Sequence, residues 1–134
     1  GLVYGVVVSL GFATYENYTY VYEWASIVAK EENYDFLKFS YHVAKGRSYS
    51  AIPMHGLNGA VMGYYFGLYA FSGNKKYLVL SLILPYLFHG FYNFLGWPNM
   101  LIIIGILIVY SLVLHSNLRQ LQLTKKKEWE IKKI

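Results

Sequence analysis

Three ionisable side chains lie inside apolar stretches of this sequence, where a charge is costly. Glu16, His55 and His89 each sit in a run that could cross a lipid bilayer, and an ionisable group there costs about 2.5–3.5 kcal/mol on insertion scales. One carboxylate and two imidazoles are a common ligand set for catalytic zinc with one position open to water. Hydrogen-bonded core or interfacial histidines are the alternative, and spacing alone does not separate the two.

The residues around these side chains predict a polytopic membrane protein. Of its 134 residues, 56% are hydrophobic and only 14% are charged, against roughly 25% in soluble domains. A helix needs about 20 apolar residues to cross the hydrocarbon core, so we predict an all-α membrane helix bundle with four transmembrane helices. The predicted spans cover about residues 1–22, 52–71, 77–96 and 100–115. They form one domain, 1–117, with an outer loop at 23–51 and a basic tail at 118–134.

The basic residues are unevenly distributed about the predicted spans. Eight lie in the turn at 72–76 and in the tail, against four in the loop at 23–51. By the positive-inside tendency, we therefore expect the tail on the cytoplasmic side of the membrane and the loop on the outer side. With this topology Glu16, His55 and His89 all fall in the outer halves of their helices. Because the tail directly follows an apolar run, the expected partner of its charge is the lipid bilayer and not nucleic acid.

Several chemistries are excluded by composition and by motif. The sequence has no cysteine, which excludes disulfide-stapled domains, iron–sulfur sites and cysteine-ligated zinc modules. No HExxH, GxSxG, Walker or GxGxxG pattern is present. A metal or proton transporter is a third alternative, which the sequence disfavours without excluding it. It would need polar residues through the inner half of the spans as well, and Val6–Val8 and Leu78–Leu84 are largely apolar there.

Small residues recur every four positions in the first two spans. The residues are Gly1, Gly5, Ser9 and Ala13 in the first span, and Gly59, Gly63 and Gly67 in the second. Such stripes let helix backbones approach closely in lipid. They predict tight packing inside one bundle, with a homodimer face as the alternative. Pro85 should bend the third span one turn before His89.

Polar neighbours could support the three ionisable residues through hydrogen bonds. Three asparagines follow them by one, three and four residues: Asn17, Asn58 and Asn93. Residues three and four apart lie on the same face of a helix. His42 and His115 lie in the loop and at a span end, and we interpret both as ordinary surface or interfacial residues.

Three strings, taken in order, resemble the PrsW family of intramembrane metalloproteases, relatives of the CAAX-processing and bacteriocin-immunity membrane proteases. Gly11–Asn17 (GFATYEN) looks like the family's GFAxxEN helix. Arg47–His55 (RSYSAIPMH), followed by Gly63–Gly67 (GYYFG), is similar to its Arg…His…GY helix. His89–Asn93 (HGFYN) looks like its HGxxN helix. The resemblance covers about residues 1–96.

The resemblance implies peptide-bond hydrolysis in or near the membrane, acting on a membrane-anchored protein of the anti-sigma-factor type at its outer side. It implies that His55 and His89 bind a metal ion, with zinc expected, and that Glu16 is either a further ligand or the general base. Asn93 would orient a ligand or stabilise the tetrahedral oxyanion. The supporting positions are Asn17, Asn58 and Arg47.

One element of the family is missing from this sequence. The family carries a Glu-Glu-xx-Lys motif on a helix before the GFAxxEN helix, and Glu31–Glu32 does not match it because Asp35 stands where the lysine should be. The start at Gly1 has no initiator methionine, basic region or cleavage site, so we expect a chain shortened on its N-terminal side. The paired glutamates would be the natural general base, so this segment alone could be inactive. The alternative function is a non-catalytic membrane binding or immunity protein that keeps only the helices.

Overall fold

The computed structural model describes residues 1–131, which are helical apart from short turns. The elements are α1 (Leu2–Tyr18), the π-helix η1 (Thr19–Trp24), α2 (Ala25–Glu31), α3 (Phe36–Tyr49), α4 (Ala51–Ser72), α5 (Lys75–Leu95) and α6 (Met100–Ile131). Over this range no strand occurs, and the all-α prediction is confirmed. Residues 132–134 of the predicted tail lie outside the described residues.

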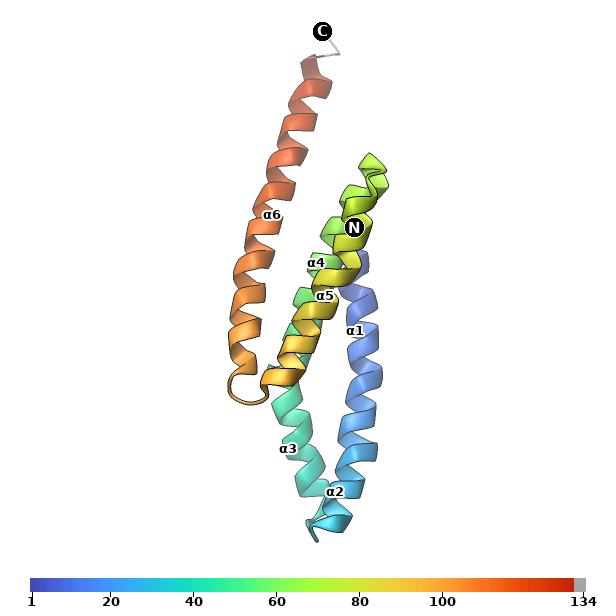
Figure 1. Cartoon of the computed structure of the whole chain (residues 1–134), viewed down its shortest axis with the longest axis vertical. Coiled ribbons are helices and arrows are strands. Elements are labelled where there is room, and N and C mark those ends of the chain that lie inside the picture. The colour runs from blue at the N-terminus through green and yellow to red at the C-terminus, as the bar shows by residue number, and fades with distance from the viewer. Residues whose placement is uncertain (132–134) are drawn as a thin grey trace.

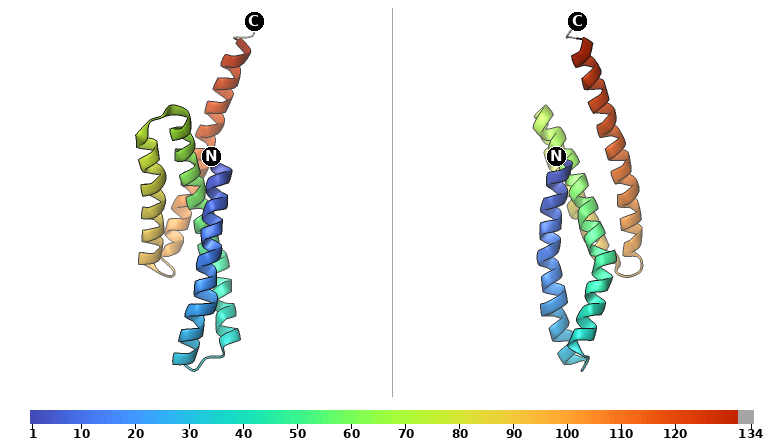
Figure 2. Two further views of the ribbon diagram at one scale, coloured as in Figure 1. Left: turned by 90° about the vertical axis from the view of Figure 1, so that its right-hand side faces the viewer. Right: turned by 180° about the vertical axis from the view of Figure 1, so that it is seen from behind.

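Four long helices, α1, α4, α5 and α6, run roughly alongside one another and alternate in direction (Figure 1). Helix α4 is central, since it packs against α1, α5 and α6. The α2–α3 hairpin and the α5–α6 turn lie toward one end (Figure 2). The α4–α5 turn and the C-terminal part of α6 lie toward the other end. The two basic segments therefore share an end of the bundle, as their predicted topology requires.

The segment predicted as an outer loop, 23–51, is largely helical. Elements η1 and α2 continue α1 as far as Glu31, and α3 begins after Asp35, whose side chain accepts a hydrogen bond from the Lys38 amide at 2.8 Å. Aromatic contacts close the hairpin, with the Phe39 ring centroid 5.9 Å from that of Trp24. The charged residues of this segment indicate exposure to water. They do not oppose helix formation, because lysine and glutamate, like alanine, favour the helical state.

The helix that carries the last predicted span, 100–115, is longer than that span. Helix α6 begins at Met100 as expected, but it continues without a break through the basic residues to Ile131. The tail was expected either as a surface helix or as a disordered end, and its described part is helical. The α4–α5 turn is as short as predicted, because Gly73 takes φ +68° and Asn74 caps α5 by accepting from the Lys76 amide at 3.0 Å.

Two helices, α5 and α6, are long and apolar enough to cross a membrane on length and composition alone. Large apolar side chains are exposed on these helices and on α1, including Leu82, Phe94, Val109 and Val7. An exposed apolar surface of this extent is unfavourable in water and favourable against hydrocarbon. The spans at α1 and α4 remain predictions.

The small-residue stripes of α1 and α4 pack against each other. A Cβ atom on Gly59 would lie 2.5 Å from the carbonyl oxygen of Gly5, and one on Gly63 would lie 2.6 Å from that of Gly1. Real Cβ atoms do not approach so closely, so only glycine allows this contact. The Ser9 hydroxyl donates to the backbone oxygen of His55 at 2.7 Å. Packing inside one bundle, as predicted from the stripes, is confirmed.

Candidate metal centre

Glu16, His55 and His89 converge from three different helices. One possible ligand atom from each lies within 4.8 Å of the others. Nε2 of His55 is 3.0 Å from Oε2 of Glu16, and Nε2 of His89 is 3.6 Å from Oε1. The two imidazole ring centroids are 5.1 Å apart. The structure thus brings together all three residues that the sequence singled out.

Helix direction explains why these residues meet. Glu16 lies two residues before the end of α1, His55 is the fifth residue of α4, and His89 lies six residues before the end of α5. Because consecutive long helices run in opposite directions, these positions fall at a similar depth. The close glycine contact between α1 and α4 then brings the first two helices near enough for their side chains to touch.

Arg47 reaches this cluster from α3. Its Nη2 forms an ion pair with Oε2 of Glu16, and its Nε donates to Oδ1 of Asn17 at 2.7 Å. The guanidinium carbon also lies 4.2 Å from the ring centroid of Tyr20, in a cation–π contact. The side chains of Arg47 and Glu16 are 15% and 19% exposed. Each charge is therefore mostly removed from solvent and paired.

Tyr20 lies in the π-helical turn that follows α1. In this turn, Thr19–Trp24, backbone hydrogen bonds join residues five apart and not four as in an α-helix, so the residues after it are rotated about the helix axis. Turns of this kind often occur at functional sites. Here the turn contains Tyr20, whose ring makes the cation–π contact with Arg47.

The His89 ring has one partner and one unsatisfied nitrogen. Its Nδ1 lies 3.2 Å from the amide nitrogen of Asn93, one turn later on α5. Its Nε2 is buried and has no hydrogen-bond partner among residues 1–131. That unsatisfied nitrogen is the one directed at Glu16.

The donor set fits a divalent cation such as zinc. With Zn–N and Zn–O bonds near 2.0–2.2 Å, tetrahedral ligand atoms lie roughly 3.4 Å apart. His55 Nε2 lies 3.0 Å from Oε2 of Glu16 and His89 Nε2 lies 3.6 Å from Oε1, and these two distances bracket that value. One ligand atom from each of the three residues lies within 4.8 Å of the others. A cation here would also satisfy Nε2 of His89, a buried polar atom that has no hydrogen-bond partner in the described part of the chain.

Asn58 is not brought to this cluster. Its amide nitrogen donates to the sulfur of Met54 at 2.9 Å, and its Oδ1 finds no partner in the described part of the chain. One turn of helix places Asn58 near His55 along the chain, but its side chain bonds along α4. No side-chain contact observed among residues 1–131 joins Asn58 to the cluster, so its predicted supporting role stays a prediction.

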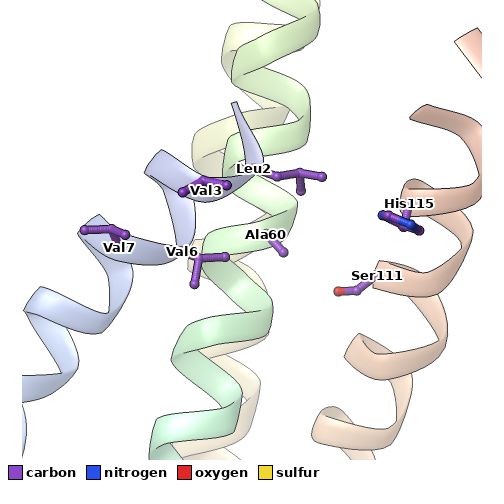
Figure 3. A pocket seen from close by; sticks show the side chains of 7 residues that line it. All are labelled: Leu2, Val3, Val6, Val7, Ala60, Ser111 and His115. Atoms are coloured by element: carbon purple, nitrogen blue, oxygen red, sulfur yellow. The ribbon is translucent and has the colours of Figure 1, made fainter. Parts of the chain in front are cut away.

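The two remaining histidines are also outside the cluster. His42 is exposed on α3 beside Tyr41. His115, on α6, lines a hollow of about 340 Å³ with Ser111 and with residues of α1 and α4 (Figure 3). This hollow has mostly apolar walls and lies around the start of α1, whereas the candidate metal centre lies near its end.

Sequence reasoning missed two aromatic residues beside the centre. The Phe12 ring centroid lies 5.6 Å from that of His55 and 6.5 Å from that of His89. Tyr20 supports Arg47. Both lie four residues from Glu16, one turn before and one turn after, so helical spacing from the carboxylate would have identified them.

The fold and this cluster define a class: a helical membrane protein with a partly buried carboxylate–imidazole centre. The family model described as "PrsW family intramembrane metalloprotease" matches residues 1–116. The chain belongs to this family, which confirms the resemblance seen in the three sequence strings.

Curated relatives support this assignment. The chain is 30% identical to Protease PrsW of Clostridioides difficile over 135 residues, covering 94% of this chain and 52% of that protein. It is 38% identical to Protease PrsW of Bacillus subtilis over 98 residues, covering 71% of this chain and 38% of that protein. The chain thus spans about half or less of the length of these relatives. No solved structure matches it.

Proposed function

We propose that this chain forms most of the catalytic core of a metal-dependent intramembrane endopeptidase. The observation that carries the proposal is the convergence of Glu16, His55 and His89, from three helices, to within 4.8 Å. Zinc is the proposed metal because carboxylate and imidazole ligands with an open position are typical of catalytic zinc. The proposed substrate is a membrane-anchored protein of the anti-sigma-factor type.

The proposed roles follow from the contacts. His55 and His89 would hold the cation through Nε2, and Glu16 would be the third ligand, since its two oxygens face the two imidazoles. A bound zinc ion supplies Lewis acidity that polarises a carbonyl and acidifies water. Arg47 keeps the Glu16 carboxylate charged and oriented. Asn93 holds the far side of the His89 ring.

The proposed membrane orientation places this centre toward the outer face, with the C-terminal tail in the cytoplasm. The centre lies near the end of the bundle formed by the α2–α3 hairpin and the α5–α6 turn. The two basic segments lie at the opposite end. This separation agrees with the positive-inside tendency.

Metal analysis of the full-length protein tests the proposal. We expect about one zinc per protein, lost in His55→Ala and in His89→Ala, together with loss of cleavage of a membrane-anchored substrate. His42→Ala is the matched control, because this histidine is exposed and far from the cluster along α3. Full cleavage by either cluster variant would reject the assignment.

A non-catalytic membrane protein is the second candidate. The observation in its favour is that Glu16 pairs with Arg47 of α3 and hydrogen-bonds to His55 of α4. Such a network could serve only to hold α1, α3 and α4 together. A full-length protein that binds no zinc, yet loses thermal stability in Glu16→Ala, would favour this second function.

A further inference from the structure

His89 faces a different polar group through each ring nitrogen. Nδ1 lies 3.2 Å from the amide nitrogen of Asn93, and Nε2 lies 3.6 Å from Oε1 of Glu16. A neutral imidazole carries one hydrogen, on one nitrogen or the other. The partner at Nδ1 therefore decides what Nε2 can do.

In the observed arrangement the hydrogen belongs on Nε2. The Asn93 amide nitrogen can only donate, so Nδ1 must accept with its lone pair. The hydrogen on Nε2 then points toward a carboxylate oxygen, which is electrostatically favourable although 3.6 Å is too long for a hydrogen bond. In this tautomer Nε2 has no lone pair for a cation.

The opposite tautomer needs only a half-turn of the Asn93 carboxamide. Its oxygen and nitrogen are nearly the same size, so the turn exchanges acceptor and donor at the same place. With Oδ1 toward the ring, Nδ1 carries the hydrogen and donates it, and Nε2 presents a lone pair to the centre. Asparagine can serve both tautomers, whereas aspartate can only accept and leucine can do neither.

We propose that Asn93 is a positioning residue that sets the tautomer of His89. Its amide donates to Nδ1 in the metal-free centre, and its carbonyl accepts from Nδ1–H when Nε2 binds a cation. The change moves one proton from Nε2 to Nδ1 through solvent, with no net release. The cation-bound state rests on the proposed function, but the metal-free state does not.

Nitrogen-15 NMR of the histidine rings tests the metal-free part. The full-length protein is purified in detergent without metal and observed at a pH where the imidazoles are neutral, with His89→Gln assigning the His89 signals. We expect the Nε2–H tautomer in the wild type and the Nδ1–H tautomer in Asn93→Asp. The exposed His42 provides a reference signal that should not move. An Nε2–H tautomer in Asn93→Asp would overturn the inference.

Zinc titration tests the cation-bound part. In the wild type, zinc should convert His89 to the Nδ1–H tautomer, and Asn93→Leu should weaken zinc binding about 10–100-fold, as is usual when a ligand loses its outer partner. Asn93→Asp should bind zinc at least as tightly as the wild type. Wild-type affinity in Asn93→Leu would overturn the inference. A wild type that binds no zinc would instead reject the proposed function and the cation-bound state, while the Asn93→Asp tautomer still decides the metal-free part.

Discussion

Arg47 of α3 and His55 of α4 share one carboxylate oxygen of Glu16. The Arg47 guanidinium pairs with Oε2, and Nε2 of His55 lies 3.0 Å from the same atom. The other oxygen, Oε1, is left facing His89. The carboxylate is therefore held from one side by a permanent cation and presents both oxygens to the two imidazoles. The orientation of Glu16 therefore depends on α3, a helix that carries none of the three proposed metal ligands.

Replacing Arg47 should therefore damage the centre without removing a ligand. Arg47→Lys keeps the charge but cannot reach Glu16, Asn17 and the Tyr20 ring together. We expect a loss of about 10–100-fold in zinc affinity and in cleavage rate, as for other outer partners of metal ligands. Lys45→Arg on the same helix is the control, since Lys45 is exposed. Unchanged affinity in Arg47→Lys would show that the ion pair only ties helices together.

Glu16→Gln separates the two roles that the sequence left open for this residue. As a neutral ligand the amide binds zinc poorly, so we expect zinc content and cleavage to fall together. A general base would behave differently: its amide variant would keep the metal and lose only the rate. Zinc content is measured by atomic absorption on the same preparations that are assayed for cleavage. Wild-type zinc content in an inactive Glu16→Gln would assign Glu16 as the base.

The glycine contact between α1 and α4 should tolerate no side chain. Gly59→Ala would place a Cβ 2.5 Å from the carbonyl oxygen of Gly5, so the helices must separate. Overpacking of this kind costs typically 1–3 kcal/mol. We expect a lower thermal unfolding temperature in detergent and weaker zinc binding, because Glu16 and His55 would move apart.

The control for this glycine variant is Gly105→Ala on α6. At that position nothing within residues 1–131 lies closer than 4 Å to an added Cβ. This variant should unfold at or above the wild-type temperature, since alanine favours helix over glycine. Equal behaviour of Gly59→Ala and Gly105→Ala would contradict the observed packing of α1 on α4.

Tyr65 and Tyr110 should matter for stability and not for the metal centre. Their hydroxyl groups hydrogen-bond between α4 and α6, three turns from His55 along α4. Tyr65→Phe should lose about 1 kcal/mol of unfolding free energy, the usual contribution of one hydrogen bond. Zinc content should not change. Tyr86→Phe on the exposed side of α5 is the control, and it should leave the unfolding temperature unchanged.

The amino-acid sequence alone determined the class of this protein and the identity of its central residues. Long uncharged stretches, such as 77–118, indicated helices that lie in lipid. The cost of an ionisable group in such stretches singled out Glu16, His55 and His89 before any distance was known. The small-residue stripes also indicated that the first two spans pack closely against neighbouring helices. These are local or periodic properties, which the sequence displays directly.

The tertiary structure decided which side chains touch. Polarity in 23–51 predicted exposure, but only the structure showed that this segment folds into helices that carry Arg47 to Glu16. Residues 16, 47, 55 and 89 come from four helices, and their separations depend on how those helices pack and turn about their axes. The close contact between Gly59 and Gly5 brings together α1 and α4, the helices that carry Glu16 and His55. Such long-range distances have no counterpart in composition or spacing, which is why the partner of each ligand became visible only in the folded chain.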